Sequence, residues 1–318
     1  MTISSHLSEL HGLPAFDFPT VTAQAKTELP PVESVAWRVS SEYDGEEWED
    51  AYARFAAAVD TTRVRALIIG QWNEAYDTGP AAVIATLTAA AGEFPALRAL
   101  FLGDITYDEC EISWIQQGEV APLVEAFPEL LEFGVRGGSG LEFSKISHAK
   151  LQSLVVESGG LPVGVVRGIA AGDFPALESL DIWLGSSWYG ADTAVEDLEP
   201  FFAGTHLPNL GHLALRNSDI QDQIATAVAG APVVARLHTL DLSMGTLGDD
   251  GAEALLNGQP LTHLRSLDLH HHFLTAPMVE RLKATFEGTD VSIDLSEAEL
   301  GEVEDDEDDS HRYTSVAE

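Results

Sequence analysis

One spacing of apolar residues recurs along most of this 318-residue chain. The pattern is L-x-x-L-x-L, in which Val, Ile, Phe or Trp replaces some of the leucines. We find nine good copies and a degenerate tenth copy at Val291 and Ile293. Between fourth positions the steps are 32, 33, 33, 21, 26, 33, 27, 27 and 24 residues. The nine copies are Val32/Val35/Trp37, Val64/Leu67/Ile69, Leu97/Leu100/Leu102, Leu130/Phe133/Val135, Leu151/Leu154/Val156, Leu177/Leu180/Ile182, Leu210/Leu213/Leu215, Leu237/Leu240/Leu242 and Leu264/Leu267/Leu269.

Each copy predicts a short strand, because apolar residues two apart point to the same face of a strand. Most intervals between copies carry apolar residues three or four apart, which predicts a helix. Strand and helix repeated in this way predict an α/β fold. We expect a curved solenoid, or horseshoe, with a concave parallel sheet of about ten strands and helices on its convex side. The 21-residue step from Phe133 to Leu154 is too short for a full helix, so we expect an irregular convex segment there.

The segments Leu237–Leu256 and Asn217–Ala225 resemble the ribonuclease-inhibitor-like class of leucine-rich repeat proteins. The resemblance extends over roughly residues 32–295 and implies the horseshoe fold. The class tends to place Asn or Cys at the ninth repeat position, whereas this chain has Ser218, Gly245 and His272 there. The chain is also similar to a cytosolic bacterial group of leucine-rich repeat proteins without an assigned activity. Genes of that group neighbour genes for radical-SAM, sulfatase-like and ATP-grasp enzymes.

The chain divides into three parts by pattern and composition. Residues 1–31 lack the repeat and contain the apolar stretch Leu13–Pro19, so we expect an N-terminal cap over the first coil. Residues 32–295 form the predicted solenoid. Residues 296–318 include nine acidic and no basic residues between Glu297 and Asp309, and like-charge repulsion predicts a disordered acidic tail.

The charge balance excludes several function classes. With 52 acidic and 16 basic side chains, the chain has a formal charge of −36, which argues against nucleic-acid binding and against docking on anionic membranes. We find no candidate membrane span or signal peptide and only one cysteine, so we expect a cytoplasmic protein without disulfides. The acidity has two interpretations, attraction of a basic partner or a compositional adaptation for solubility.

The side chains at the fifth and seventh repeat positions are predicted to face out of the concave sheet. The first half of this surface is apolar or small, and the second half is acidic. Tryptophan and arginine are frequent at the energetic centres of protein interfaces. Trp114 lies in an uncharged insert, Ile112–Gln117, of the kind that extends over binding faces in solenoids. The candidate binding residues are Phe101, Trp114, Arg136, Asp181, Trp183, Arg216, Asp241, Asp268 and His270.

Four other sets of residues contain side chains of the types that bind metals or carry out catalysis. On a strand, His270 and His272 share a face and, with Asp268 or Asp241, resemble metal ligands, but no spacing completes a tetrahedral site. We therefore interpret the histidines as structural or surface residues. The cluster Asp104, Asp108, Glu109 and Glu111 lacks the spacing of a calcium loop and is interpreted as a solvated acidic loop.

Cys110 and the segment Ser158–Gly160 also have simpler interpretations. The acidic neighbours of Cys110 should raise the pKa of its thiol, which argues against a nucleophile. Ser158–Gly160 lacks the lysine and full glycine pattern of a phosphate loop, so we interpret it as a turn.

These observations favour a non-catalytic module that binds a partner protein or peptide on its concave acidic face, without a cofactor or metal. One alternative, implied by the similarity to the bacterial group, is an accessory scaffold for a modification enzyme. A second alternative is a metal-dependent hydrolase that uses the His270–His272 cluster.

Overall fold

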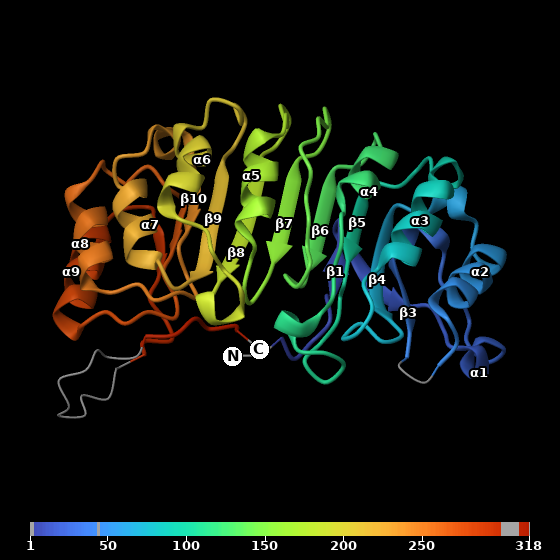
Figure 1. Ribbon diagram of the computed structural model, residues 1–318. Coiled ribbons are helices and arrows are strands. Elements are labelled where there is room, and N and C mark those ends of the chain that lie inside the picture. Colours follow the sequence, from blue (N-terminus) through green and yellow to red (C-terminus); the bar gives the residue numbers. More distant parts are fainter. Residues whose placement is uncertain (1–2, 43–44, 300–311, 318) are drawn as a thin grey trace.

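The computed structural model describes residues 3–42, 45–299 and 312–317. Within these residues one 12-stranded sheet carries its strands in sequence order, from β1 to β12 (Figure 1). β1 is antiparallel to β2, and the later neighbours pair in parallel. The strands are β1 (Glu9–Leu10), β2 (Leu13–Asp17), β3 (Ala36–Ser41), β4 (Ala66–Trp72), β5 (Ala99–Leu102), β6 (Glu132–Arg136), β7 (Ser153–Glu157), β8 (Ser179–Gly185), β9 (His212–Ser218), β10 (Thr239–Asp241), β11 (Ser266–Asp268) and β12 (Ser292–Asp294).

The helices lie together on one face of this sheet, which we call the convex face (Figure 1). Parallel neighbours require a crossover connection, and crossovers of one hand place every helix on the same side. The opposite, helix-free face is the concave face. The α-helices are α1 (Val21–Gln24), α2 (Trp48–Ala58), α3 (Ala81–Ala89), α4 (Ala121–Ala126), α5 (Val163–Ala171), α6 (Glu199–Ala203), α7 (Gln221–Val228), α8 (Asp249–Asn257) and α9 (Ala276–Phe286). The 3-10 helices are η1 (Val32–Ser34), η2 (Thr61–Arg63), η3 (Ala91–Glu93), η4 (Ile112–Trp114), η5 (Ser187–Tyr189), η6 (Val195–Leu198) and η7 (Pro232–Arg236).

The repeated leucines form one in-register ladder through the core. Leu67 pairs with Leu100, Leu100 with Phe133, and the pairing continues strand by strand to Leu267 on β11. These side chains are fully or almost fully buried between the sheet and the helices. The predicted α/β fold is confirmed, and the architecture is consistent with a leucine-rich-repeat-like solenoid.

The two end copies of the repeat are shifted from their predicted register. Trp37, not Val35, pairs with Leu67, so Arg38 and not Ala36 occupies the fifth position of β3. At the other end Ile293, not Val291, pairs with Leu267. Both end copies have weaker apolar patterns than the central copies, and strand pairing, rather than the spacing of apolar residues, fixes their register.

The short step between β6 and β7 contains no helix across its residues 137–152, all of which the structure describes. An irregular segment crosses the convex side instead, as predicted. Helix α5 packs closely against this irregular segment. Gly168 of α5 lies so near the carbonyl oxygen of Phe143 that an added Cβ would overlap that oxygen.

Residues before β3 pack against the first coil. Strand β2 extends the sheet, and the rings of Phe16 and Phe18 contact Trp37 at centroid distances of 5.4 and 6.5 Å. One further arrangement is not predicted by the sequence: residues 3–12, which we call the N-terminal arm, lie over the concave face, and Leu13 and Ala15 of β2 pack against the same apolar cluster.

The far end of the chain also departs from expectation. The predicted disordered tail spans residues 296–318, of which 300–311 and 318 lie outside the described residues. Residues 312–317 return to the molecule, and Thr314, Ser315 and Val316 are buried. The prediction of disorder is therefore wrong for 312–317, because apolar and hydrogen-bonding contacts hold them. We call residues 312–317 the C-terminal strap. Among the described residues, no helix has the length and apolar character needed to cross a membrane.

Candidate binding surface on the concave face

The N-terminal arm covers the first half of the concave face. Leu7, Leu10 and Leu13 pack against a small apolar cluster on β3, β4 and β5. Phe101, a predicted contact residue at the centre of this cluster, is only 4% exposed. The prediction that Phe101 faces solvent is wrong, because an apolar patch on a solenoid face is stabilised when the chain's own leucines cover it. The covered residues are Ala36, Ala66, Ile68, Ala99 and Phe101.

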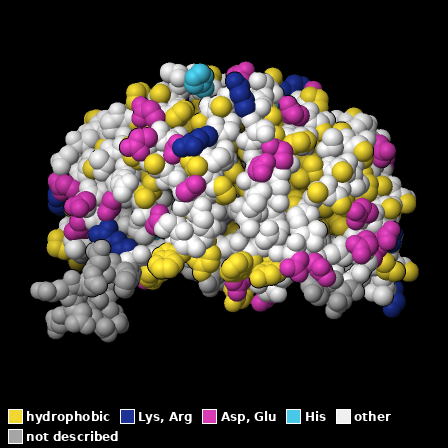
Figure 2. Space-filling view, in the orientation of Figure 1, with side chains coloured by type: hydrophobic (Ala, Val, Ile, Leu, Met, Phe, Trp, Pro, Cys, Tyr) yellow, Lys and Arg dark blue, Asp and Glu magenta, His cyan; other side chains and the backbone are white. Residues whose placement is uncertain are grey.

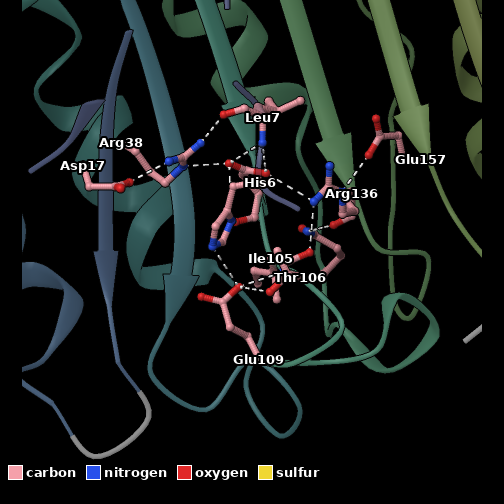
Figure 3. Close-up of polar contacts among 11 residues, drawn as sticks. His6, Leu7, Asp17, Arg38, Ile105, Thr106, Glu109, Arg136 and Glu157 are labelled. Atoms are coloured by element: carbon pink, nitrogen blue, oxygen red, sulfur yellow. Dashed lines mark hydrogen bonds and ion pairs between the residues drawn. The ribbon is translucent and has the colours of Figure 1, made fainter. Parts of the chain in front are cut away.

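A buried carboxylate holds the arm in place. Asp104 accepts hydrogen bonds from the backbone N–H of Leu7 at 3.0 and 3.2 Å, from Arg38 Nε at 2.7 Å and from Arg136 Nη1 at 3.2 Å. His6 Nδ1 lies 3.0 Å from the backbone oxygen of Asp104 (Figure 3). Asp104 is completely buried, which corrects its interpretation as part of a solvated loop. Two guanidinium groups supply the compensation that a buried carboxylate requires.

Arg136 is a structural member of this cluster rather than a free contact residue. Its Nε donates to Glu157 Oε2 at 2.6 Å, and its Nη1 also donates to the carbonyl oxygen of Ile105 at 3.0 Å (Figure 3). The residue is 3% exposed, so its predicted role as a solvent-facing contact is wrong. The guanidinium also lies over the Phe101 ring, 5.5 Å from its centroid.

The second half of the concave face carries a different set of charged residues. Arg216 on β9 donates to Asp181 on β8 at 3.0 and 2.7 Å, and its Nη1 lies 3.3 Å from Asp241 Oδ2 on β10. Its guanidinium carbon lies 5.0 Å from the ring centroid of Trp183. Burial raises the pKa of Asp181 to about 6, although Arg216 lowers it. The side chains of Trp183 and Asp241 are less than a tenth exposed, so neither side chain projects into solvent as a contact residue.

An acidic ladder continues to the end of the sheet. Asp241, Asp268 and Asp294 occupy the same register position on β10, β11 and β12. His270 Nδ1 lies 2.8 Å from Asp268 Oδ1, and this hydrogen bond raises the pKa of His270. Asp268, His270 and Asp294 each offer one donor atom within 4.8 Å of the others, a spacing at which a divalent cation can be shared. Carboxylates outnumber cations along this ladder.

His272 does not join His270. The chain leaves β11 through His271, whose φ of 52° is left-handed, and this breaks the alternation of a strand. His272 is therefore fully buried, with its Nε2 lying 3.2 Å from the carbonyl oxygen of Leu295 and its Nδ1 accepting from the N–H of Leu274 at 3.2 Å. Burial lowers the pKa of His272. The alternative in which His270 and His272 act together as metal ligands is therefore wrong, and His272 is a buried residue.

Exposed aromatic residues lie in the loops that follow the carboxyl ends of the strands. Trp114 is 43% exposed, and its ring contacts Tyr76 at a centroid distance of 5.9 Å. Trp188, in the loop after β8, is 91% exposed. Figure 2 shows hydrophobic side chains along the lower rim, whereas acidic side chains are scattered over the helical face. The sequence-predicted contact Trp114 is thus exposed, at the end of η4 in the loop after β5.

The two remaining sequence candidates have structural roles. Burial, together with Glu111 and Glu109, raises the pKa of the Cys110 thiol to about 11. Ser158 is fully buried and its Oγ accepts from the N–H of Gly160 at 2.9 Å, which is the geometry of a turn. Neither group has the properties of a nucleophile or a phosphate site.

The C-terminal strap crosses the lower edge of the second half, where Figure 1 places both chain ends. The Asn217 side chain bonds the backbone of Val316 twice, accepting from its N–H at 2.9 Å and donating to its carbonyl oxygen at 2.6 Å. The Val316 side chain packs with Ile112, Trp183 and Met244. Sequence reasoning missed Asn217, Met244 and the strap, because an acidic, repeat-free tail carries no periodic signal.

Comparison with known proteins gives a similar architecture and no family. No protein-family profile and no curated protein matches the chain. The fold is similar to the crystal structure of a Bacteroides fragilis protein that was a structural-genomics target, with a TM-score of 0.77 and 27% sequence identity. The match covers 84% of this chain and 76% of that one. The chain therefore has the α/β solenoid architecture of at least one bacterial protein, and this similarity assigns no activity to it.

Proposed function

We propose that this chain is a non-catalytic leucine-rich repeat protein of the ribonuclease-inhibitor-like class that binds a basic partner protein or peptide on its concave face. The binding surface would be the acidic second half of that face, from β8 to β12. The first half is not offered to a partner, because the N-terminal arm covers it. The observation that carries the proposal is the excess of carboxylates along the acidic ladder.

The electrostatics of this surface favour a cationic ligand. Four carboxylates of this surface, Asp181, Asp241, Asp268 and Asp294, lie near one arginine, Arg216, and near the histidines His212 and His270. In-register like charges on neighbouring strands destabilise one another unless a counter-charge intervenes. A lysine or arginine of the partner would provide this counter-charge. Complementary charge also raises the rate of association between two proteins. The raised pKa of Asp181 has burial as its first cause, and the neighbouring carboxylates Asp241 and Glu157 raise it further.

Charge reversal at the open end of the ladder tests the proposal. Asp268→Lys/Asp294→Lys changes two residues that are only partly buried or exposed, whereas Asp241 is too buried for a clean test. The matched control is Glu49→Lys/Asp50→Lys, which makes the same charge change at exposed positions of α2. Tagged chains are cross-linked mildly in the native cell and the recovered proteins are quantified.

We expect the wild-type and control chains to recover the same basic partner, and the concave variant to lose at least nine-tenths of it. High salt should weaken recovery by the wild type. Equal recovery by all three chains, or no reproducible partner for any of them, would contradict the proposal.

A further inference from the structure

The strap is held as a peptide ligand is held, through its backbone. Asn217 satisfies both the N–H and the carbonyl oxygen of Val316. The N–H of Ser315 donates to the carbonyl oxygen of Met244 at 2.7 Å, and His271 Nε2 lies 3.0 Å from the carbonyl oxygen of Tyr313. Backbone bonds of this kind give affinity for an extended segment whatever its side chains are.

Three of the residues that bind the backbone of the strap come from equivalent positions of successive repeats. Asn217, Met244 and His271 each lie four residues after the ladder leucine of β9, β10 and β11. All three have left-handed backbones, with φ of 53°, 66° and 52°. Non-glycine residues seldom adopt this conformation, and such strain concentrates at binding sites. The repeat thus builds a row of backbone-binding positions along the edge of the sheet.

Side-chain pockets along this row give it selectivity. Val316 enters the apolar pocket of Ile112, Trp183 and Met244. The Tyr313 ring contacts the rings of His271 and Phe273, each at a centroid distance of 5.4 Å. Arg312 Nη1 donates to Asp222 Oδ2 at 2.7 Å. The pockets therefore accept a basic residue, an aromatic residue next to it and a β-branched residue three places further on.

We call the row of Asn217, Met244 and His271, together with these pockets, the groove. The groove also allows the close approach of a peptide backbone. Ser113 Oγ donates to the carbonyl oxygen of Ala317. A Cβ added at Gly159 would lie 2.5 Å from that same oxygen, so only glycine allows the strap to approach there. Close approach of a backbone to a glycine is a property of peptide and ligand sites.

The strap does not use every bond that the groove offers. Trp183 Nε1 and Thr314 Oγ1 are buried and have no hydrogen-bond partner among the described residues. Trp183 Nε1 is therefore a buried donor that a bound segment can satisfy. A segment with an acceptor near Trp183 Nε1 would fit this groove better than the strap does.

We propose that the groove is a binding site for an extended peptide segment of a partner protein and that the strap is its tethered competitor. The pattern of that segment is a basic residue, an aromatic residue, two spacer residues and a β-branched residue. This inference deepens the proposed interaction function and rests on it. A tethered segment competes at an effective concentration on the order of millimolar, so release of the strap controls access.

A labelled peptide provides the probe. The hexapeptide Arg-Tyr-Thr-Ser-Val-Ala, copied from residues 312–317, carries a fluorophore and is titrated with full-length chains in an anisotropy assay. Tyr313→Ser/Val316→Ser weakens the strap without touching the groove. Val21→Ser/Tyr107→Ser is the matched control at exposed positions elsewhere. Hydrogen exchange at Ser315 and Val316 reports whether the strap has opened.

We expect the strap variant to bind the peptide at least tenfold more tightly than the wild-type and control chains. Addition of Asn217→Gly to the strap variant should return binding to the wild-type level. If the strap opens and the peptide still does not bind, the inference is overturned. If both amides stay protected in the strap variant, the strap is a permanent part of the fold, and the inference is also overturned.

Two further readouts separate this inference from its alternatives. A wild-type dimer that dissociates in the strap variant would assign the groove to a second copy and overturn the partner assignment. Asp268→Lys/Asp294→Lys lies outside the groove and should leave peptide binding unchanged. A peptide that fails to bind, while the acidic ladder still recovers a partner, would refute this inference alone. Equal partner recovery by the wild type and by Asp268→Lys/Asp294→Lys, with intact peptide binding, would refute only the proposed surface.

Discussion

The two ends of the chain cover the concave side in physically different ways. The N-terminal arm buries leucines on an apolar cluster and places its backbone on Asp104, a carboxylate between two buried arginines. The C-terminal strap buries Val316 and depends on backbone bonds to three turn residues and to Ser113. The arm therefore has the contacts of a core, and the strap has those of a ligand. From this comparison we infer that the solenoid makes one half of its inner face permanent and leaves the other half open to exchange.

The largest effect should follow removal of the arm's anchor. Asp104→Ala leaves Arg38 and Arg136 buried without their shared partner. We expect a loss of about 3–5 kcal/mol in the free energy of unfolding, measured by denaturant titration. Asp17→Ala removes an exposed partner of the same Arg38 and should cost less than about 1 kcal/mol. Equal losses in both variants would contradict a core-like arm.

A smaller effect should follow removal of the strap's anchor. Asn217→Gly keeps the left-handed backbone and deletes the amide that bonds Val316. We expect a loss of about 1–3 kcal/mol. Much of it should appear as local opening, so hydrogen exchange should accelerate at Ser315 and Val316 and stay unchanged at Leu7. A uniform acceleration at all three amides would show that the strap is no more separable than the arm.

The smallest effect concerns the pH response of the open half. The pKa of His270 is raised by its hydrogen bond to Asp268, whereas burial lowers the pKa of His272. The stability contributed by His270 is thus fully present below its unfolded pKa of about 6.5 and is lost as the pH rises through its higher folded pKa. In NMR titrations, His270 should titrate above 6.5 and His272 below it. Asp268→Asn should lower the pKa of His270 and leave that of His272 unchanged; identical titrations before and after the substitution would exclude the pairing.

The sequence predicts the fold well because the ladder residues repeat a short local pattern. Leu100, Leu180 and Leu240 lie at their predicted register positions. The spacing of three and then two residues between apolar positions fixes which side chains face the core. The pattern fails at Trp37 and Ile293, where the copies are weak and strand pairing sets the register.

The binding surface is only partly predictable, because its coverage depends on long-range contacts. Leu7 meets Asp104 across 97 residues, and Asn217 meets Val316 across 99. Neither contact has a periodic signal. The columns of the repeat correctly place Asp268 and His270 on the partly open concave face, but they cannot show that the chain's own ends bury Phe101 and Trp183.

Native-state hydrogen exchange of the wild-type chain tests the central contrast most directly. The amides of Leu7 and Val316 each donate to one side chain, Asp104 and Asn217 respectively. We predict that Leu7 exchanges only through global unfolding, whereas Val316 exchanges at least about a hundredfold faster through local opening of the strap. Equal protection of the two amides, with both following global unfolding as denaturant is added, would contradict the account.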